Sequence, residues 1–258
     1  VSFIHRVFCV SGLPLRVPRN STEPYRRYDG RFALTINPRD ITLPSGTPCF
    51  IGVPWGAKAR LLTIWANTVV HDQSRRAGDR ILEIGRIDQW LSEVGITKTG
   101  KNVVATKDQL IRLMFCDFSM FYKVRGSDGE ALDIFKVDRL FEAGAFSDGD
   151  LEHYAAGRID KIKWPKAMEL SEIAYNRFRD SAIPIPTSRL AEISNSALAI
   201  DLFLYLCYRL PQIGRLPEHP NVFYAQAYSG HGLNATHLAG CLLAEAITAQ
   251  QSHGFDLF

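Results

Sequence analysis

The stretch ILEIGRIDQWLSEVGITKTGKNVVATKDQLIRLMF, residues 81–115, decides the fold. Its first five residues, 81–85, are apolar and β-branched enough to predict a short strand. Apolar residues then recur at intervals of three and four, which predicts a helix over 87–95. A basic turn over 97–107 follows, and a second helix is expected to start near Thr106. This is the core of a helix-turn-helix.

The flanking segments extend this pattern on both sides. Residues 55–70, WGAKARLLTIWANTVV, have the apolar spacing of another helix. After the second helix, two extended runs at 118–125 and 131–137 flank GSDG, a hairpin turn signal. The order helix, strand, helix, turn, helix, hairpin is typical of a winged helix-turn-helix. The hairpin would be the wing, and the helix near Thr106 would face a DNA major groove.

The rest of the chain adds shorter pieces, so we expect an α+β protein. The opening, residues 3–10, is helix-like; 32–36 and 49–53 are strand-like and are separated by the turn-rich 37–46. Further on, 159–164 is strand-like, whereas 170–178 and 196–210 are helix-like. We divide the chain into an N-terminal cap (1–50), a winged-helix domain (51–146), a partial second winged-helix unit (147–211), and a linker with a strand–helix tail (212–258).

Composition indicates a soluble globular protein. The 258 residues are 46% hydrophobic and 22% charged, with no apolar run long enough to span a membrane. No export signal is evident, and five scattered cysteines without a C-x-x-C pair fit a reducing cytoplasm. The net charge of +3 is uneven, because residues 212–258 hold one basic and three acidic side chains. The first 211 residues therefore carry a basic surplus, which permits a nucleic-acid partner without requiring one.

Basic and amide side chains cluster around the helix-turn-helix and the wing. Lysine and arginine there can neutralise phosphates, and asparagine or arginine at a helix start can reach base edges. A solvated face is the alternative explanation of the same charges. The candidate DNA-binding residues are Lys98, Lys101, Asn102, Lys107 and Arg112 on the turn and helix, and Lys123 and Arg125 on the wing, with Arg75, Arg76 and Arg80 preceding the strand.

Five motifs together resemble one protein family. They are FIHRVFCVSGLPLR (3–16), IGVPWGAKARLLTIWANT (51–68), ILEIGRIDQWLSEVGI (81–96), TGKNVVATKDQLIRL (99–113) and LAIDLFLYLCYRL (198–210). In this order they resemble the plasmid-encoded RepA-type replication initiators, over residues 1 to about 211. The resemblance implies a winged-helix protein that binds origin DNA, recruits host replication proteins and catalyses nothing itself.

The chain departs from that family after residue 211. Family members continue into a further helix-turn-helix and wing, whereas PQIGRLPEHP leads here into unrelated sequence. Residues 218–258 instead resemble the C-terminal end of FAD-dependent oxidoreductases of the D-amino-acid-oxidase type. In that family the glycine-rich turn lies beside the flavin, which would assign this contact to Gly230, His231, Gly232 and Thr236.

A complete flavin site is not expected. The dinucleotide fold needs a G-x-G-x-x-G turn followed by a helix, a second strand and an acidic residue, about 30 residues or more in all. The one G-x-G, at 230–232, has too little chain after it. We therefore expect no cofactor and no enzyme activity, with a FAD-dependent oxidoreductase fragment as the alternative.

Two weaker patterns remain. The histidines at 219, 231, 237 and 253 lack the spacing and the cysteine partners of a metal site, so no metal is expected. Phe115, Phe118, Phe121 and Tyr122 lie beside basic residues and could stack on bases, although packing explains them more simply. The resulting hypothesis is a cytoplasmic initiator, with duplex origin DNA and host replication proteins as partners and a homodimer as one arrangement.

Overall fold

The computed structural model describes residues 1–28, 32–72, 74–76, 78–83, 85–94, 96–125, 130–180, 182–209, 213–216 and 219–225. The chain divides into two compact units, Val1–Asp201 and Leu202–Phe258. Within the described part of the second unit lie the antiparallel strands β12 (Ile213–Leu216) and β13 (His219–Ala225). Helix α8 (Ala197–Arg209) begins in the first unit.

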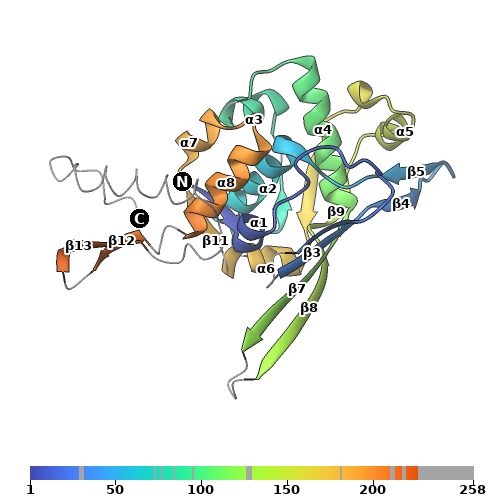
Figure 1. Cartoon of the computed structure of the whole chain (residues 1–258). Helices are drawn as coiled ribbons and strands as arrows, with labels where there is room; N and C mark the ends of the chain where they lie inside the picture. The colour runs from blue at the N-terminus through green and yellow to red at the C-terminus, as the bar shows by residue number, and fades with distance from the viewer. Residues whose placement is uncertain are drawn as a thin grey trace. The chain divides into compact units, whose positions relative to one another are not determined.

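The expected order of helices is confirmed in the first unit (Figure 1). It comprises α2 (Gly56–Val70), β6 (Ile81–Leu82), α3 (Ile87–Glu93) and α4 (Gly100–Phe115). The expected start of the last helix near Thr106 is wrong, because α4 begins six residues earlier. The Thr99 hydroxyl caps it by accepting a hydrogen bond from the Asn102 backbone N–H at 3.2 Å. The basic turn is therefore short, and Lys101, Asn102 and Lys107 lie on the helix.

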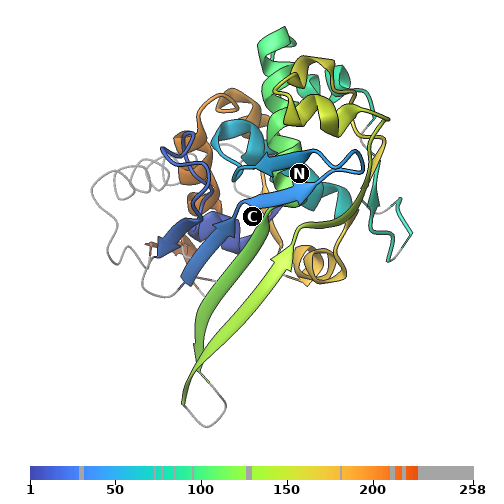
Figure 2. The ribbon, with the colours of Figure 1, turned by 90° about the vertical axis from the view of Figure 1, so that its right-hand side faces the viewer.

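The expected hairpin is also confirmed, but it belongs to a larger sheet. Strands β7 (Asp117–Arg125) and β8 (Ala131–Arg139) pair with β3 (Phe32–Asn37) and β2 (Tyr25–Tyr28) in the order β2-β3-β7-β8. Leu34, Ile36 and Phe118 are buried on one face of this sheet. Figure 2 shows the two long strands extending away from the helices.

The strand that follows α2 does not join this hairpin. Instead β6 pairs with β10 (Ala167–Leu170), which in turn pairs with β9 (Phe141–Ala145), so the three form a separate sheet. The first unit is thus a mixed helix and sheet fold. Its strand pairing differs from the expected winged helix-turn-helix, in which β6 would pair with the hairpin of β7 and β8.

The structure corrects three other local expectations. The opening residues form a strand, β1 (Ser2–His5), before a short helix, α1 (Arg6–Val10), because β1 pairs with β11 (Ala182–Ile185). The turn-rich stretch contains β4 (Arg39–Thr42), which pairs with β5 (Pro48–Ile51). The strand-like 159–164 holds the 3-10 turn η1 (Ile159–Lys161). The remaining helices are α5 (Asp150–Ala155), α6 (Glu172–Asp180) and α7 (Thr187–Glu192).

The core of the first unit is organised around α2, most of whose residues are buried. One of them is Arg60, whose side chain is 3% exposed. Its guanidinium donates to both carboxylate oxygens of Asp201, at 2.5 and 2.6 Å, and to the carbonyls of Leu13, Pro14 and Gly56. Since a buried charge is tolerated only with such partners, these contacts tie the N-terminal segment and the start of α8 to α2.

We expect Asp201→Ala to lower the free energy of unfolding by about 3 kcal/mol, because Arg60 would stay buried without its counter-charge. Urea denaturation followed by circular dichroism measures this loss. The matched control is Glu192→Ala, which removes an acid from an exposed ion pair with Arg189 and should cost under about 1 kcal/mol. Equal losses for the two variants would contradict the role assigned to Arg60.

Candidate nucleic-acid interface

The start of α4 presents two exposed lysines beside α3. Lys98 precedes the helix, and its ammonium lies 3.4 Å from the Asp88 carboxylate while its side chain remains 63% exposed. Lys101 is exposed on the first turn. The Asn102 side chain is instead used locally, because its amide donates to the Thr97 carbonyl at 2.7 Å. Of the three, the lysines are the ones whose charged ends face solvent.

The two other basic residues expected on this helix point to internal partners. The Lys107 ammonium donates to the backbone carbonyl of Ile162, and desolvation lowers the pKa of this lysine. The Arg112 Nε–H lies 2.9 Å from both carboxylate oxygens of Asp108, one turn earlier on α4. Both cations hold α4 against neighbouring segments, Lys107 through the Ile162 carbonyl and Arg112 through a further hydrogen bond of 3.4 Å from its guanidinium to the Val53 carbonyl.

Asp108 is the centre of a buried polar network. It accepts hydrogen bonds from the Tyr154 hydroxyl at 3.0 Å and from the Gln109 amide at 2.8 Å, in addition to Arg112. Gln109 in turn accepts from the Trp55 backbone N–H at 2.7 Å. Burial, followed by the charge of Asp108, raises the pKa of Tyr154. The network joins α5, α4 and the residue before α2.

A second basic element borders the helix pair, and sequence reasoning missed it. Residues 156–166, here called the basic segment, hold four exposed cations, Arg158, Lys161, Lys163 and Lys166, against one acid, Asp160. The segment is held on both helices, because Lys107 of α4 contacts its backbone and the Trp164 ring lies 6.4 Å from the Trp90 ring of α3. Its composition was visible in the sequence, but only these contacts place it beside α4.

The wing residues are placed by their backbone only. Lys123 and Arg125 lie in β7, but their side chains, and the turn at 126–129, are outside the described residues. Figures 1 and 2 both show the start of α4 and the far end of β7 at opposite ends of the unit. Since α4 is about 24 Å long and β7 about 30 Å, the turn and the wing are well separated.

The arginines before β6 are mostly engaged in ion pairs. Arg75 contacts Asp79 at 2.9 Å, and Arg80 contacts Glu142 and Glu169 at 2.5 and 2.7 Å. Arg76 is exposed. Arg80 thus connects the segment before β6 to β9 and β10, which gives it a structural role in this sheet.

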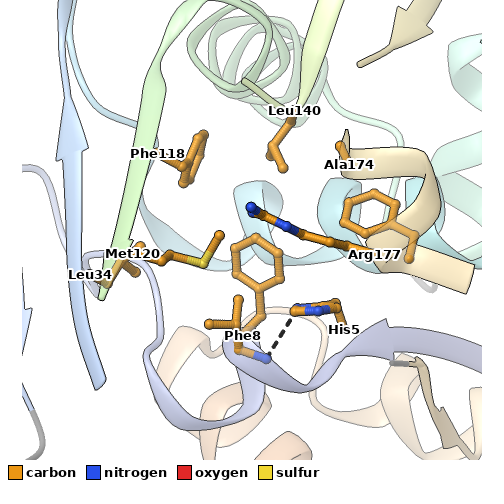
Figure 3. A pocket seen from close by; sticks show the side chains of 10 residues that line it. His5, Phe8, Leu34, Phe118, Met120, Leu140, Ala174 and Arg177 are labelled. Atoms are coloured by element: carbon orange, nitrogen blue, oxygen red, sulfur yellow. Dashed lines mark hydrogen bonds between the residues drawn. The ribbon is translucent and has the colours of Figure 1, made fainter. Parts of the chain in front are cut away.

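A pocket that the described residues form beside the hairpin sheet is small. The pocket in Figure 3 is lined by Phe8, Phe118, Leu140, Arg177 and others, and its volume of about 20 Å³ is of the order of one water molecule. In it, His5 Nδ1 accepts from the Val7 N–H at 3.3 Å. Gly230, His231, Gly232 and Thr236 lie outside the described residues.

Two further features are absent from the described residues. Within them, no group of three or more His, Cys, Asp or Glu side chains is arranged to hold a metal ion. Nor does any helix in that part of the chain combine the length and the apolar character that a bilayer-spanning segment requires.

Comparison with known proteins gives one extensive match and one short one. Residues 53–224 match the family described as plasmid-encoded RepA protein. The match continues past residue 211, the position at which we expected the resemblance to this family to end. Gamma-glutamylputrescine oxidoreductase of Escherichia coli (strain K12) is 48% identical over 56 residues, which are 22% of this chain and 12% of that enzyme. The chain therefore spans only a small part of this oxidoreductase.

Two solved structures are similar at low sequence identity. Both contain domains 2 and 3 of RctB. One, a selenomethionine derivative, is 12% identical with a TM-score of 0.48, and the match covers 79% of this chain and 73% of that one. The other is 14% identical with a TM-score of 0.47, over 96% and 84% of the respective chains.

We expect Tyr154→Phe to lower the free energy of unfolding by about 1–2 kcal/mol, because Asp108 loses one donor in a buried network. The pH dependence gives an independent check. The pKa of Tyr154, ordinarily 10.0, is raised in the folded state. Above about pH 10 the unfolded state therefore binds fewer protons, and stability falls with rising pH by about 1.4 kcal/mol per unit for this one group.

Above about pH 10, the free energy of unfolding should therefore fall less steeply with pH in Tyr154→Phe than in the unmodified chain. The difference is the contribution of this one ionisable group, about 1.4 kcal/mol per pH unit. Urea denaturation repeated between about pH 9 and 11 measures the two slopes. Parallel slopes would mean that the Tyr154 hydroxyl ionises as readily in the folded chain as in the unfolded one.

Proposed function

This chain belongs to the family of plasmid-encoded RepA proteins, and we propose that it initiates plasmid replication by binding duplex DNA at the replication origin. The observation that carries the proposal is the pair of exposed lysines at the start of α4, the second helix of the helix-turn-helix. A helix start concentrates unpaired backbone N–H groups and the positive end of the helix dipole. Lys98 and Lys101 add two charges at that end.

The proposed mechanism is binding without turnover. Lys98 and Lys101 neutralise phosphates and release condensed counterions, which makes the affinity depend on salt. Lys107 and Arg112 act indirectly, because their internal contacts fix the position of α4. The basic segment extends the contact along the backbone through Lys161 and Lys163, which are both exposed. Lys123 and Arg125 would reach DNA only if the hairpin wraps toward the same duplex.

The partners follow from the same proposal. They are duplex origin DNA and the host proteins that load a replication fork, with a homodimer as one arrangement on repeated sites. The proposed location is the cytoplasm, where such DNA resides. No cofactor is required, since the chemistry consists of charge neutralisation and groove contact.

The alternative is a FAD-dependent oxidoreductase fragment. The observation behind it is the 56-residue match to the E. coli enzyme, which spans 12% of that enzyme's length. We expect the purified chain to show no visible flavin absorption, before or after incubation with FAD, because no complete dinucleotide-binding unit is expected around the one G-x-G turn, at 230–232. A bound yellow chromophore that survives gel filtration would favour the alternative.

The initiator proposal predicts a steep salt dependence of duplex binding. A fragment of the plasmid replicon that encodes this chain should lose affinity by orders of magnitude between about 50 and 200 mM salt. In Lys98→Ala with Lys101→Ala, the slope of log affinity against log salt should be smaller by about two, as two phosphate contacts are lost. Fluorescence anisotropy titrations at several salt concentrations measure both.

Arg179→Ala is the matched control for these lysines. Arg179 is exposed but lies on α6, beside the Tyr175 ring, far from the start of α4 in Figure 1. The Arg179→Ala variant should leave the slope of log affinity against log salt unchanged. The proposal would be overturned if the affinity for duplex DNA changed neither with salt concentration nor on substitution of the two lysines.

A further inference from the structure

The hairpin that was expected to serve as the wing has no surplus of positive charge. Residues 117–139, which span β7, β8 and the residues between them, hold four basic and five acidic side chains, a net charge of −1. The strand register sets Lys123 directly across from Asp133, and Arg139 forms an ion pair with Asp117 at 2.8 Å. Opposite charges in such cross-strand positions attract each other. The hairpin is therefore a poor match for a line of DNA phosphates.

The basic segment, residues 156–166, has the opposite charge balance. It holds four basic side chains and one acid, a net charge of +3 in a stretch half as long as the hairpin. The acid, Asp160, lies 3.7 Å from the Lys161 ammonium, but the two side chains are 62% and 66% exposed. Because such an exposed ion pair is weak, it does not prevent Lys161 from contacting a phosphate.

Inward and outward side chains alternate along the second half of this segment. Ile162 is 1% exposed and Pro165 is buried, whereas Lys161, Lys163 and Lys166 are exposed. Ile162 belongs to a core cluster that also contains residues of β5 and α4. The apolar side chains thus fasten the segment to the core and leave its three lysines on the surface.

Polar contacts fix the backbone of the same residues. The Lys107 ammonium of α4 donates to the Ile162 carbonyl. The Lys163 backbone N–H donates to the Asp150 carboxylate at 3.0 Å, and Asp150 is 2% exposed. Since these contacts use the backbone of the segment, they do not occupy the charged ends of its lysines.

Helix α3 connects the basic segment to the exposed lysines at the start of α4. The Trp164 ring lies 6.4 Å from the Trp90 ring of α3. Two residues before Trp90, the Asp88 carboxylate lies 3.4 Å from the Lys98 ammonium. Figures 1 and 2 both show α5, which leads into the segment, beside α4, and the far end of β7 at the opposite end of the unit. The segment and Lys98 are therefore neighbours, and the far end of the hairpin is not.

We propose that the basic segment takes the place of the wing, so that it contacts the phosphates beside the groove entered by α4 while the hairpin lies outside that duplex. This inference rests on the proposed binding of origin DNA and names the second element of the contact. Arg158, Lys161, Lys163 and Lys166 neutralise phosphates. Because the core already fixes the backbone of the segment, that backbone does not have to be ordered on binding, which lowers the cost of association.

The test compares two double variants of the full chain that remove the same charge from different places. In Lys161→Ala with Lys163→Ala, the backbone contacts of the segment remain, and the slope of log affinity against log salt should be smaller by about two. Lys123→Ala with Arg125→Ala removes two charges from the hairpin and should leave that slope unchanged. Fluorescence anisotropy titrations with the same replicon duplex, at several salt concentrations, measure both slopes.

A second pair of variants tests the anchor of the segment at constant charge. Trp164→Ala removes the ring beside Trp90 and keeps every cation, so duplex affinity should fall several-fold, because a loosened segment must be ordered on binding. Trp164→Phe keeps a ring and should restore the affinity. The Trp164 Nε1–H has no hydrogen-bond partner among the described residues, so phenylalanine loses no such bond. Equal affinities of Trp164→Ala and the unmodified chain would contradict the fixed position of the segment.

The outcomes separate this inference from the duplex proposal on which it rests. A smaller slope in the Lys161 and Lys163 variant, with an unchanged slope in the hairpin variant, supports it. An unchanged slope in the first variant, or a smaller slope in the hairpin variant, overturns it while the result for Lys98 and Lys101 still stands. If duplex affinity depends neither on salt nor on Lys98 and Lys101, the two proposals fail together.

Discussion

The first unit depends on burying one charge, the guanidinium of Arg60. Its partners come from three regions distant in sequence, namely the carbonyls at 13–14, the first turn of α2, and Asp201 at the start of α8. Because burying the guanidinium with any of them missing costs free energy, the core is most stable only when the three regions come together. Gly12 reflects the same constraint: a Cβ there would lie 2.6 Å from an Asp201 carboxylate oxygen.

Much of the fold was predictable wherever the signal is local. Helix α2 and the hairpin follow from apolar periodicity and a turn signal within a few residues. The start of α4 was missed because Val103 and Val104 and the neighbouring lysines weaken the helical pattern, while the Thr99 cap acts over three residues. Strand β1 was missed for a different reason. Its partner β11 lies about 180 residues away, and nothing in the local sequence reports that pairing.

In the candidate site, too, the sequence revealed local features but not contacts between distant residues. Composition identified cations near the helix-turn-helix, but it could not reveal which of them are used internally. Arg112 and Lys101 look equivalent in the sequence, yet one contacts Asp108 and the other is exposed. Likewise, Lys107 and Ile162 are more than fifty residues apart, and only their hydrogen bond places the basic segment beside α4.

Helix α4 and the sheet that carries the hairpin are connected by rigid structure. Helix α4 ends at Phe115 and β7 begins at Asp117, with Cys116 between them fully buried and its N–H bonded to the Arg112 carbonyl. Arg112 is itself held by Asp108, whose other partners are Tyr154 and Gln109. No flexible loop therefore separates α4 from the sheet that carries the hairpin.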